Sequence, residues 1–261
     1  MNTSAPSVSI VPGPFRALGG IWRLTYPGFF AGRRLLILTG LAAVLYLLTT
    51  QNAHAGSASY FYSWAVEFYL IFLLPAVTFL AAAGALRDDM QSVSVDYLLT
   101  RPVRRASLVF FRYISQFACL QLTALIPLAA LYVAGTQQNV ADLWPMLPHL
   151  LLAQVLVIGG FSALGFLFGA LTTRYFVLGV VYGLVVEIGV GQIPTQISRL
   201  SMTHHVLAML SPLVPGVRGT HAPESYWVAV GAFVLFMIIA LGGAMAVFSL
   251  REFSGSGTAE K

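Results

Sequence analysis

Residues 150–171 read LLLAQVLVIGGFSALGFLFGAL, a run of 22 residues that contains no charged side chain. The hydrocarbon core of a bilayer is about 30 Å thick and a helix rises about 1.5 Å per residue, so about 20 apolar residues can cross it. This stretch reaches that length. It therefore predicts a transmembrane helix.

The composition of the whole chain extends this prediction. Of its 261 residues 58% are hydrophobic and 9% are charged, whereas an ordinary soluble protein has about 45–50% apolar residues. Five further apolar stretches, of 16 to 27 residues, have an uncharged centre and are predicted to span: Leu35–Thr50, Tyr60–Leu86, Leu108–Ala134, Phe176–Ile193 and Ser225–Leu250. The sequence thus predicts an all-α integral membrane protein with six transmembrane helices and both termini on one side.

The basic residues predict which side that is, because Lys and Arg near span ends are retained in the cytoplasm. With the amino terminus inside, only Arg199 and Arg218 fall outside. The inner segments hold Arg16, Arg23, Arg33, Arg34, Arg87, Arg101, Arg104, Arg105, Arg112, Arg174, Arg251 and Lys261. Both termini are therefore expected in the cytoplasm, and the net charge of +5 reflects topology and not nucleic-acid binding.

The two ends of the chain flank the predicted transmembrane domain of residues 33–250. Residues 1–14 are rich in Ser and Pro and are expected to be a disordered tail. Residues 15–32 mix aromatic rings with Arg16 and Arg23, which suits an amphipathic helix in the headgroup layer in contact with lipids; a mobile basic tail is the alternative. Residues 251–261 are expected to be a cytoplasmic tail.

Small residues and prolines predict how the spans pack. Two glycine pairs have the spacing that lets helix backbones approach closely: Gly165 with Gly169, and Gly179 with Gly183. Whether they pack within one subunit or between two stays open. Pro75 and Pro127 lie inside the second and third spans, where each removes a backbone hydrogen bond and predicts a kink.

The connection at 194–223 is predicted to lie outside and to carry a short amphipathic helix at the outer leaflet. Four apolar residues fall near helical spacing: Ile197, Leu200, Leu207 and Leu210. The outer side also holds all five histidines, which are His54, His149, His204, His205 and His221. They are expected to be solvated or interfacial; a metal site is the alternative, since Met202 and Met209 lie nearby.

Glu187 lies in the outer half of the fifth span. Insertion scales give a cost of about 2.5–3.5 kcal/mol for a charge at the centre of a membrane helix, so such residues usually face a polar path or partner. We expect Glu187 to border the transport route or the subunit seam. A protonated or interface-seeking carboxylate is the alternative, and Glu67 is expected to be interfacial.

The inner loop between the second and third spans concentrates charge. Ser94 can cap a short helix, Asp96 falls in its first turn, and Pro102 ends it, with Leu98 and Leu99 as an apolar patch. A short helix parallel to the membrane is expected. Its arginines could hold the topology and contact lipid phosphates, or the loop could dock a cytoplasmic partner.

The stretch RDDMQSVSVDYLLTRPVRRASLVFFR (residues 87–112) resembles the signature of ABC-type-2 transporter permeases. In that family an acidic pair precedes a Gly-Thr-aliphatic-Glu-x-Leu-Leu run, followed by Arg-Pro-aliphatic and a basic residue. The matching positions are Asp88, Asp89, Asp96, Leu98, Leu99, Arg101, Pro102 and Val103, whereas Val93 and Ser94 replace Gly-Thr. Residues 182–205, YGLVVEIGVGQIPTQISRLSMTHH, resemble the fifth span and outer connection of bacterial members.

The resemblance implies the permease subunit of a bacterial exporter in the inner membrane, paired with a second copy, a homodimer being expected. Two cytoplasmic ATPase subunits would bind through the loop residues Asp88, Asp89, Asp96, Tyr97, Leu98, Leu99, Arg101, Pro102, Arg104 and Arg105. ATP and magnesium are expected on those partners, because a P-loop needs Gly-Lys-Ser/Thr and the only lysine here is Lys261.

Two other functional classes remain as alternatives. A stand-alone channel or secondary transporter would be expected to show an inverted repeat or a chain of intramembrane acids, and the sequence shows neither clearly. A membrane-embedded enzyme would need clustered catalytic side chains, and Glu187 and Cys119 are poor material for one. The transported substrate stays open.

Overall fold

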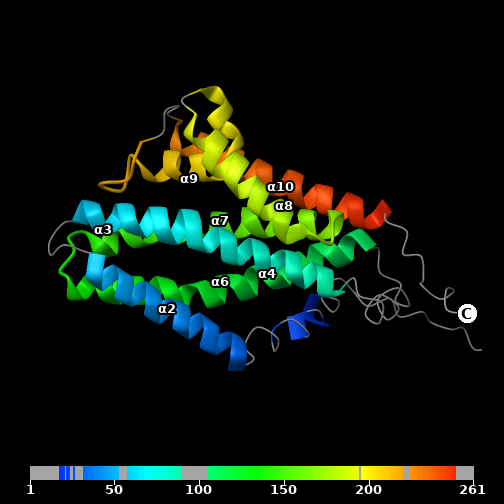
Figure 1. Cartoon of the computed structure of the whole chain (residues 1–261), viewed down its shortest axis with the longest axis horizontal. Helices are drawn as coiled ribbons and strands as arrows, with labels where there is room; N and C mark the ends of the chain where they lie inside the picture. The colour runs from blue at the N-terminus through cyan, green and yellow to red at the C-terminus, as the bar shows by residue number, and fades with distance from the viewer. Residues whose placement is uncertain are drawn as a thin grey trace, which may run out of the picture.

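The computed structural model of the chain describes residues 18–20, 22–23, 26, 32–52, 58–89, 105–193, 195–219 and 224–250. Within these residues every regular element is helical (Figure 1). The hydrocarbon core of a bilayer favours helices, because a helix satisfies its own backbone hydrogen bonds where no water is present. The all-α prediction is therefore confirmed for the described part of the chain.

Twelve helical segments follow one another along the described part of the chain. Their bounds are α2 (Gly32–Asn52), α3 (Ala58–Trp64), η1 (Ala65–Leu73), α4 (Leu74–Asp89), α6 (Arg105–Gln137), α7 (Leu143–Leu171), α8 (Tyr175–Tyr182), η2 (Gly183–Gly189), η3 (Val190–Gln192), η4 (Gln196–Leu200), α9 (Met202–Leu210) and α10 (Tyr226–Leu250). Two of these, η1 and η2, are π-helical. Each sits inside a longer helical run, and η1 ends two residues before Pro75.

Four of the helical runs are long and apolar enough to cross a membrane: Ala58–Asp88, Ala106–Gln137, Leu143–Leu171 and Tyr226–Leu250. They support a multi-pass membrane protein. Two shorter apolar stretches, Thr39–Gln51 in α2 and Tyr175–Gly189, occupy the places of the first and fifth expected spans. The fourth span also begins earlier than expected, at Leu143 and not at Leu150.

Helix α7 forms the centre of the bundle and packs mainly against α4 and α10. Its glycines allow the closest approach: a Cβ atom on Gly165 would lie 2.6 Å from the Phe79 carbonyl oxygen, and one on Gly169 would lie 2.8 Å from that of Ala83. Both distances are shorter than van der Waals contact. This glycine pair therefore packs within one subunit, against α4.

The bundle has two distinct ends. Figure 1 shows α4 ending and α6 beginning on the right, and we call this the loop end. Helix α9 lies at the opposite, upper left end, which we call the cap end. Residues 195–219, which include η4 and α9, form what we call the cap segment, and α9 packs against α10 and α7.

The prediction of one continuous amphipathic helix within the connection at 194–223 is wrong in one respect, because residues 195–210 form two helices. The segment is helical, but Ser201 has an extended backbone (φ −85°, ψ 132°) and separates η4 from α9. Ile197 and Leu200 therefore lie on η4 and are exposed, whereas Leu210 on α9 is buried in the core. The reason is that the Ser201 side chain accepts a hydrogen bond from the His204 N–H and so starts a new helix.

Several expectations fall outside the described residues. These are the tails at 1–14 and 251–261 and most of the inner loop, including Ser94 and Pro102. Of the expected interfacial helix at 15–32, residues 18–20, 22–23 and 26 are described and helical, as is the start of α2 at Gly32. The Trp22 and Tyr26 rings lie 5.7 Å apart, and Trp22 packs against the main hydrophobic core.

Candidate functional site

The described structure brings the two flanks of the expected docking loop to the same end of the bundle. Helix α4 ends at Asp89 and α6 begins at Arg105, both at the loop end (Figure 1). Asp88 has an exposed side chain there. The other expected docking residues lie outside the described residues: Asp96, Tyr97, Leu98, Leu99, Arg101, Pro102 and Arg104.

Glu187 makes the densest hydrogen-bond network of the cap end. Its Oε1 accepts from the Tyr182 hydroxyl at 2.7 Å and from the Met202 backbone N–H at 3.2 Å. Its Oε2 accepts from the Ser201 hydroxyl at 2.6 Å and from Thr203 twice, through the backbone N–H at 3.0 Å and the hydroxyl at 2.8 Å. Both carboxylate oxygens are thus fully engaged.

This network explains how a carboxylate is stable in an apolar segment. The free N–H groups at the first turn of α9 point at Glu187, and the helix dipole favours a negative charge there. Ser201 takes part in both interactions at the start of α9: its hydroxyl donates to Glu187 and accepts from the His204 N–H at 3.3 Å. Glu187 therefore joins η2 to α9. Its expected place at the transport route or subunit seam stays a prediction.

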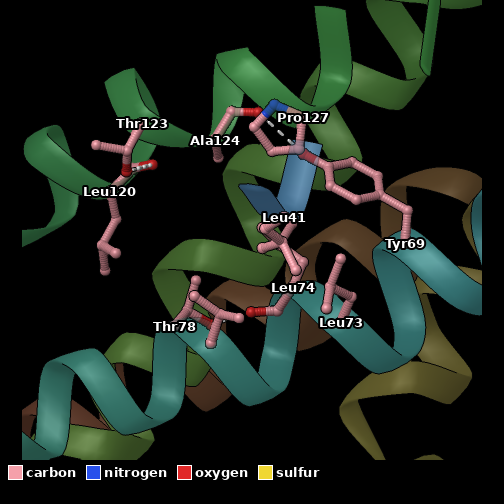
Figure 2. Close-up of a pocket in the computed structure, with 10 residues that line it drawn as sticks. Leu41, Tyr69, Leu73, Leu74, Thr78, Leu120, Thr123, Ala124 and Pro127 are labelled. Atoms are coloured by element: carbon pink, nitrogen blue, oxygen red, sulfur yellow. Dashed lines mark hydrogen bonds between the residues drawn. The ribbon is translucent and has the colours of Figure 1, made fainter. Parts of the chain in front are cut away.

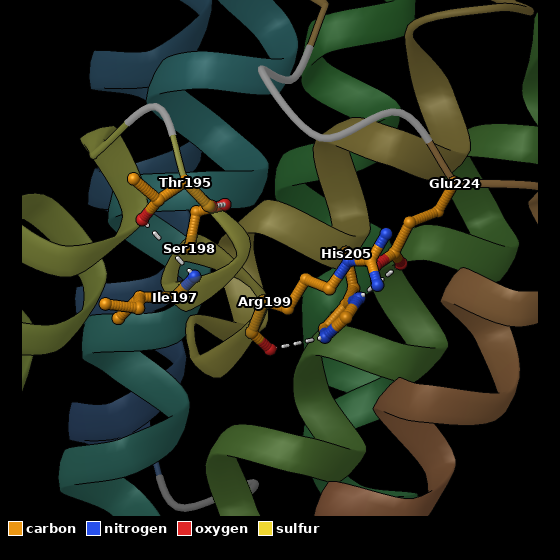
Figure 3. Close-up of polar contacts among 6 residues, drawn as sticks. All are labelled: Thr195, Ile197, Ser198, Arg199, His205 and Glu224. Carbon is orange, nitrogen blue, oxygen red and sulfur yellow. Dashed lines mark hydrogen bonds and ion pairs between the residues drawn. The ribbon is translucent and has the colours of Figure 1, made fainter.

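A second carboxylate, Glu224, holds the opposite side of the cap segment. Its Oε1 lies 2.6 Å from the Arg199 Nε, and its Oε2 lies 3.0 Å from the His205 Nδ1. The other ring nitrogen of His205, Nε2, lies 2.9 Å from the Arg199 carbonyl oxygen (Figure 3). One carboxylate thus connects η4, α9 and the residues that lead into α10.

The expectation that the outer histidines are solvated or interfacial is wrong for His204 and His205. Both are 3% exposed, because α9 is covered by α7 and α10 and does not lie free on a surface. No group of three His, Cys, Asp or Glu side chains within the described ranges could hold a metal ion. The sequence pattern did not reveal Glu224, because its partners lie up to 25 residues away.

A third carboxylate, Glu67 in η1, lies 3.3 Å from the Arg218 Nε. Between α9 and Arg218, Gly216 has a left-handed backbone (φ +82°), and a Cβ atom there would lie 2.2 Å from the Ser59 carbonyl oxygen. The end of the cap segment is therefore pressed against α3. The ion pair itself is exposed and contributes little energy, since such pairs are typically worth under about 1 kcal/mol.

Inside the bundle, a narrow apolar cavity lies between α2, η1, α4 and α6 next to Pro127 (Figure 2). The Tyr69 hydroxyl lies 3.0 Å from the Ala124 carbonyl oxygen and 2.8 Å from Gln154 Oε1, and so connects three helical runs. The cavity has a volume of about 30 Å³, which is room for water only. It is too small for cargo.

Comparison with known proteins adds one match. The family profile described as ABC-2 family transporter protein matches residues 29–191. The match includes the inner loop, α7 and Glu187, and it ends before the cap segment and α10. Among curated proteins, none matches the sequence.

Proposed function

The chain belongs to the ABC-2 family of transporter proteins, and on that premise we propose that it is the permease subunit of an ATP-driven exporter. The chain contributes a membrane domain with six spans and cytoplasmic termini in the inner membrane of a bacterium. Two cytoplasmic ATPase subunits bind ATP and magnesium and drive it. A second copy of the permease completes the route.

The arrangement of the bundle ends supports the docking role. Helices α4 and α6 present the flanks of the inner loop at one end, so a partner bound there contacts the second and third spans together. Several of the described arginines follow the same division: Arg87 and Arg105 lie where α4 ends and α6 begins, at the loop end, whereas Arg199 and Arg218 lie in the cap segment. This division favours a cytoplasmic loop end.

Two observations support a second copy. The cavity between α2, η1, α4 and α6 has a volume of only about 30 Å³ and cannot hold cargo, which favours a route formed elsewhere. Helices α8 and η2 bury none of their residues, and large apolar side chains such as Leu184 and Ile188 are exposed along them. Lipid covers part of this face. A second copy of the permease bound to the rest of it would create a route for cargo between the two bundles.

The proposal is tested by recovery of the ATPase partner with the purified permease. Changing Leu98→Asp and Leu99→Asp together places two charges on the apolar patch of the loop, and at least a tenfold loss of co-purified ATPase is expected. The matched control is Ile197→Asp with Leu200→Asp, two exposed apolar residues of η4 at the opposite end. This control should leave recovery unchanged.

Two outcomes would contradict the proposal. If the wild-type complex yields no nucleotide-binding subunit, the permease role itself is wrong. If recovery of the ATPase is undiminished by the loop variant, the permease role can stand but the inner loop is not the docking element.

A further inference from the structure

The clearest unexplained feature of the cap end is the environment of the buried imidazole of His205. Each ring nitrogen faces an acceptor: Nδ1 faces the Glu224 carboxylate at 3.0 Å, and Nε2 faces the Arg199 carbonyl oxygen at 2.9 Å. A neutral imidazole carries one N–H and can satisfy only one of them. Both hydrogen bonds form together only when the ring is protonated.

We propose that His205, Glu224 and Arg199 form a pH-sensitive clasp that holds the cap segment closed when His205 is protonated. The protonated ring donates to a side chain that precedes α10 and to the backbone of η4, and so fastens α9 to both neighbours (Figure 3). Loss of the proton leaves one buried acceptor without its donor. Such an unsatisfied group is costly, so the cap segment loosens.

The charged and titratable groups near the His205 ring come from four parts of the structure: the segment before α10, η4, α9 and η2. The segment before α10 contributes Glu224, whose other oxygen already accepts from the Arg199 guanidinium at 2.6 Å, so both oxygens act as acceptors. Helix η4 contributes Arg199, and α9 contributes His204, whose ring lies 5.5 Å from that of His205. From η2, Glu187 is engaged at the first turn of α9.

The two remaining neighbours of α9 supply no charge to the ring. Within Leu143–Leu171 of α7 the only His, Asp, Glu, Lys or Arg is His149, and Tyr226 is the only titratable residue of α10. The α10 residue beside the ring is Phe236, whose ring centroid lies 6.3 Å away. The proton on His205 is therefore balanced by Glu224.

The clasp has a defined hinge. Glu187 holds the amino-terminal turn of α9 through bonds that do not involve His205, so this end stays fixed when the clasp opens. The opening is expected at η4 and at Glu224, the two partners of the His205 ring. The proposal concerns the conformation of the cap segment and does not depend on transport.

Hydrogen exchange on the full-length protein in detergent micelles tests the clasp. The measurement compares exchange at about pH 5 with exchange at about pH 8, because histidine side chains gain or lose their charge in this range. The rates are corrected for the pH dependence of intrinsic amide exchange. Protection of the amides of η4 should fall about tenfold at the higher pH, the scale of one lost hydrogen bond. Amides around Gly165 in α7 serve as the reference and should not change.

Two variants separate the clasp from a general effect of pH. In Glu224→Gln the side-chain amide can donate to Nδ1, so a neutral ring satisfies both neighbours and protection should become independent of pH. In His204→Gln the dependence should persist. Equal wild-type protection at both pH values, or a dependence that survives Glu224→Gln or disappears in His204→Gln, would overturn the proposal.

Discussion

Helix α7 and the run formed by α8 and η2 are similar in composition but differ in how much of each is buried. Both are apolar, and each carries a pair of glycines four residues apart. In α7, 17 of 29 residues are buried, whereas α8 and η2 bury none. The comparison teaches that apolar character and glycine spacing identify a membrane helix without saying which helix lies at the centre.

The two glycine pairs show the difference at atomic scale. A Cβ atom on Gly165 would lie 2.6 Å from a backbone oxygen of α4, and backbone cannot move aside without displacing its helix. A Cβ atom on Gly183 would meet no atom within 4 Å. A Cβ atom on Gly179 would lie 2.2 Å from the Phe79 ring, which is a side chain and not backbone. The same spacing therefore brings both glycines of the α7 pair against the backbone of α4, whereas in the other run one glycine meets a side chain and the other meets open space.

The largest expected effect comes from placing a larger side chain at the close contact between α7 and α4. Gly165→Val forces α4 and α7 apart, and we expect it to lower the free energy of unfolding by about 3 kcal/mol. The matched variant Gly183→Val adds the same side chain into open space and should remain close to wild type. Thermal unfolding in detergent, followed by tryptophan fluorescence, measures both. Equal unfolding temperatures for the two variants would refute the close approach.

An intermediate effect is expected at the one strong polar connection of the exposed run. Glu187→Gln replaces an acceptor oxygen by an NH₂ group that faces donors of α9, at an expected cost of about 2–3 kcal/mol. Glu67→Gln is the control, because its pair with Arg218 is exposed and should cost under about 1 kcal/mol. Hydrogen exchange at Met202 and Thr203 reports the first change. Unaltered exchange there would show that Glu187 does not hold α9.

The smallest effect on the isolated subunit is expected on the open face itself. Leu184 is 58% exposed, so Leu184→Ala should change the free energy of unfolding by less than about 0.5 kcal/mol. If a second copy covers this face, the same variant should weaken the dimer measured by cross-linking in membranes. Unchanged dimerisation together with unchanged stability would assign this position to lipid.

Much of the scaffold could be predicted from the sequence because it depends on local properties. Uncharged runs of sufficient length identified the helices, and the pattern around Arg101 and Pro102 identified the family that the profile match shows. The break at Ser201 was missed, because a serine in an apolar helical pattern gives no sign that its hydroxyl will cap a helix. The partners of Glu187 were missed for a similar reason, since they lie 5 to 16 residues away, on α8, on α9 and at Ser201 between η4 and α9.

The sequence by itself determined that this is a multi-pass helical membrane protein of the ABC-2 family, because hydropathy and motif spacing are properties of neighbouring residues. Only the tertiary structure decided that α7 is central, that α8 and η2 remain exposed, and that Glu187 and Glu224 hold the cap segment. Those outcomes depend on which side chains are in contact across the bundle. The packing of helices that are distant in the sequence determines these contacts, and no local sequence pattern encodes them.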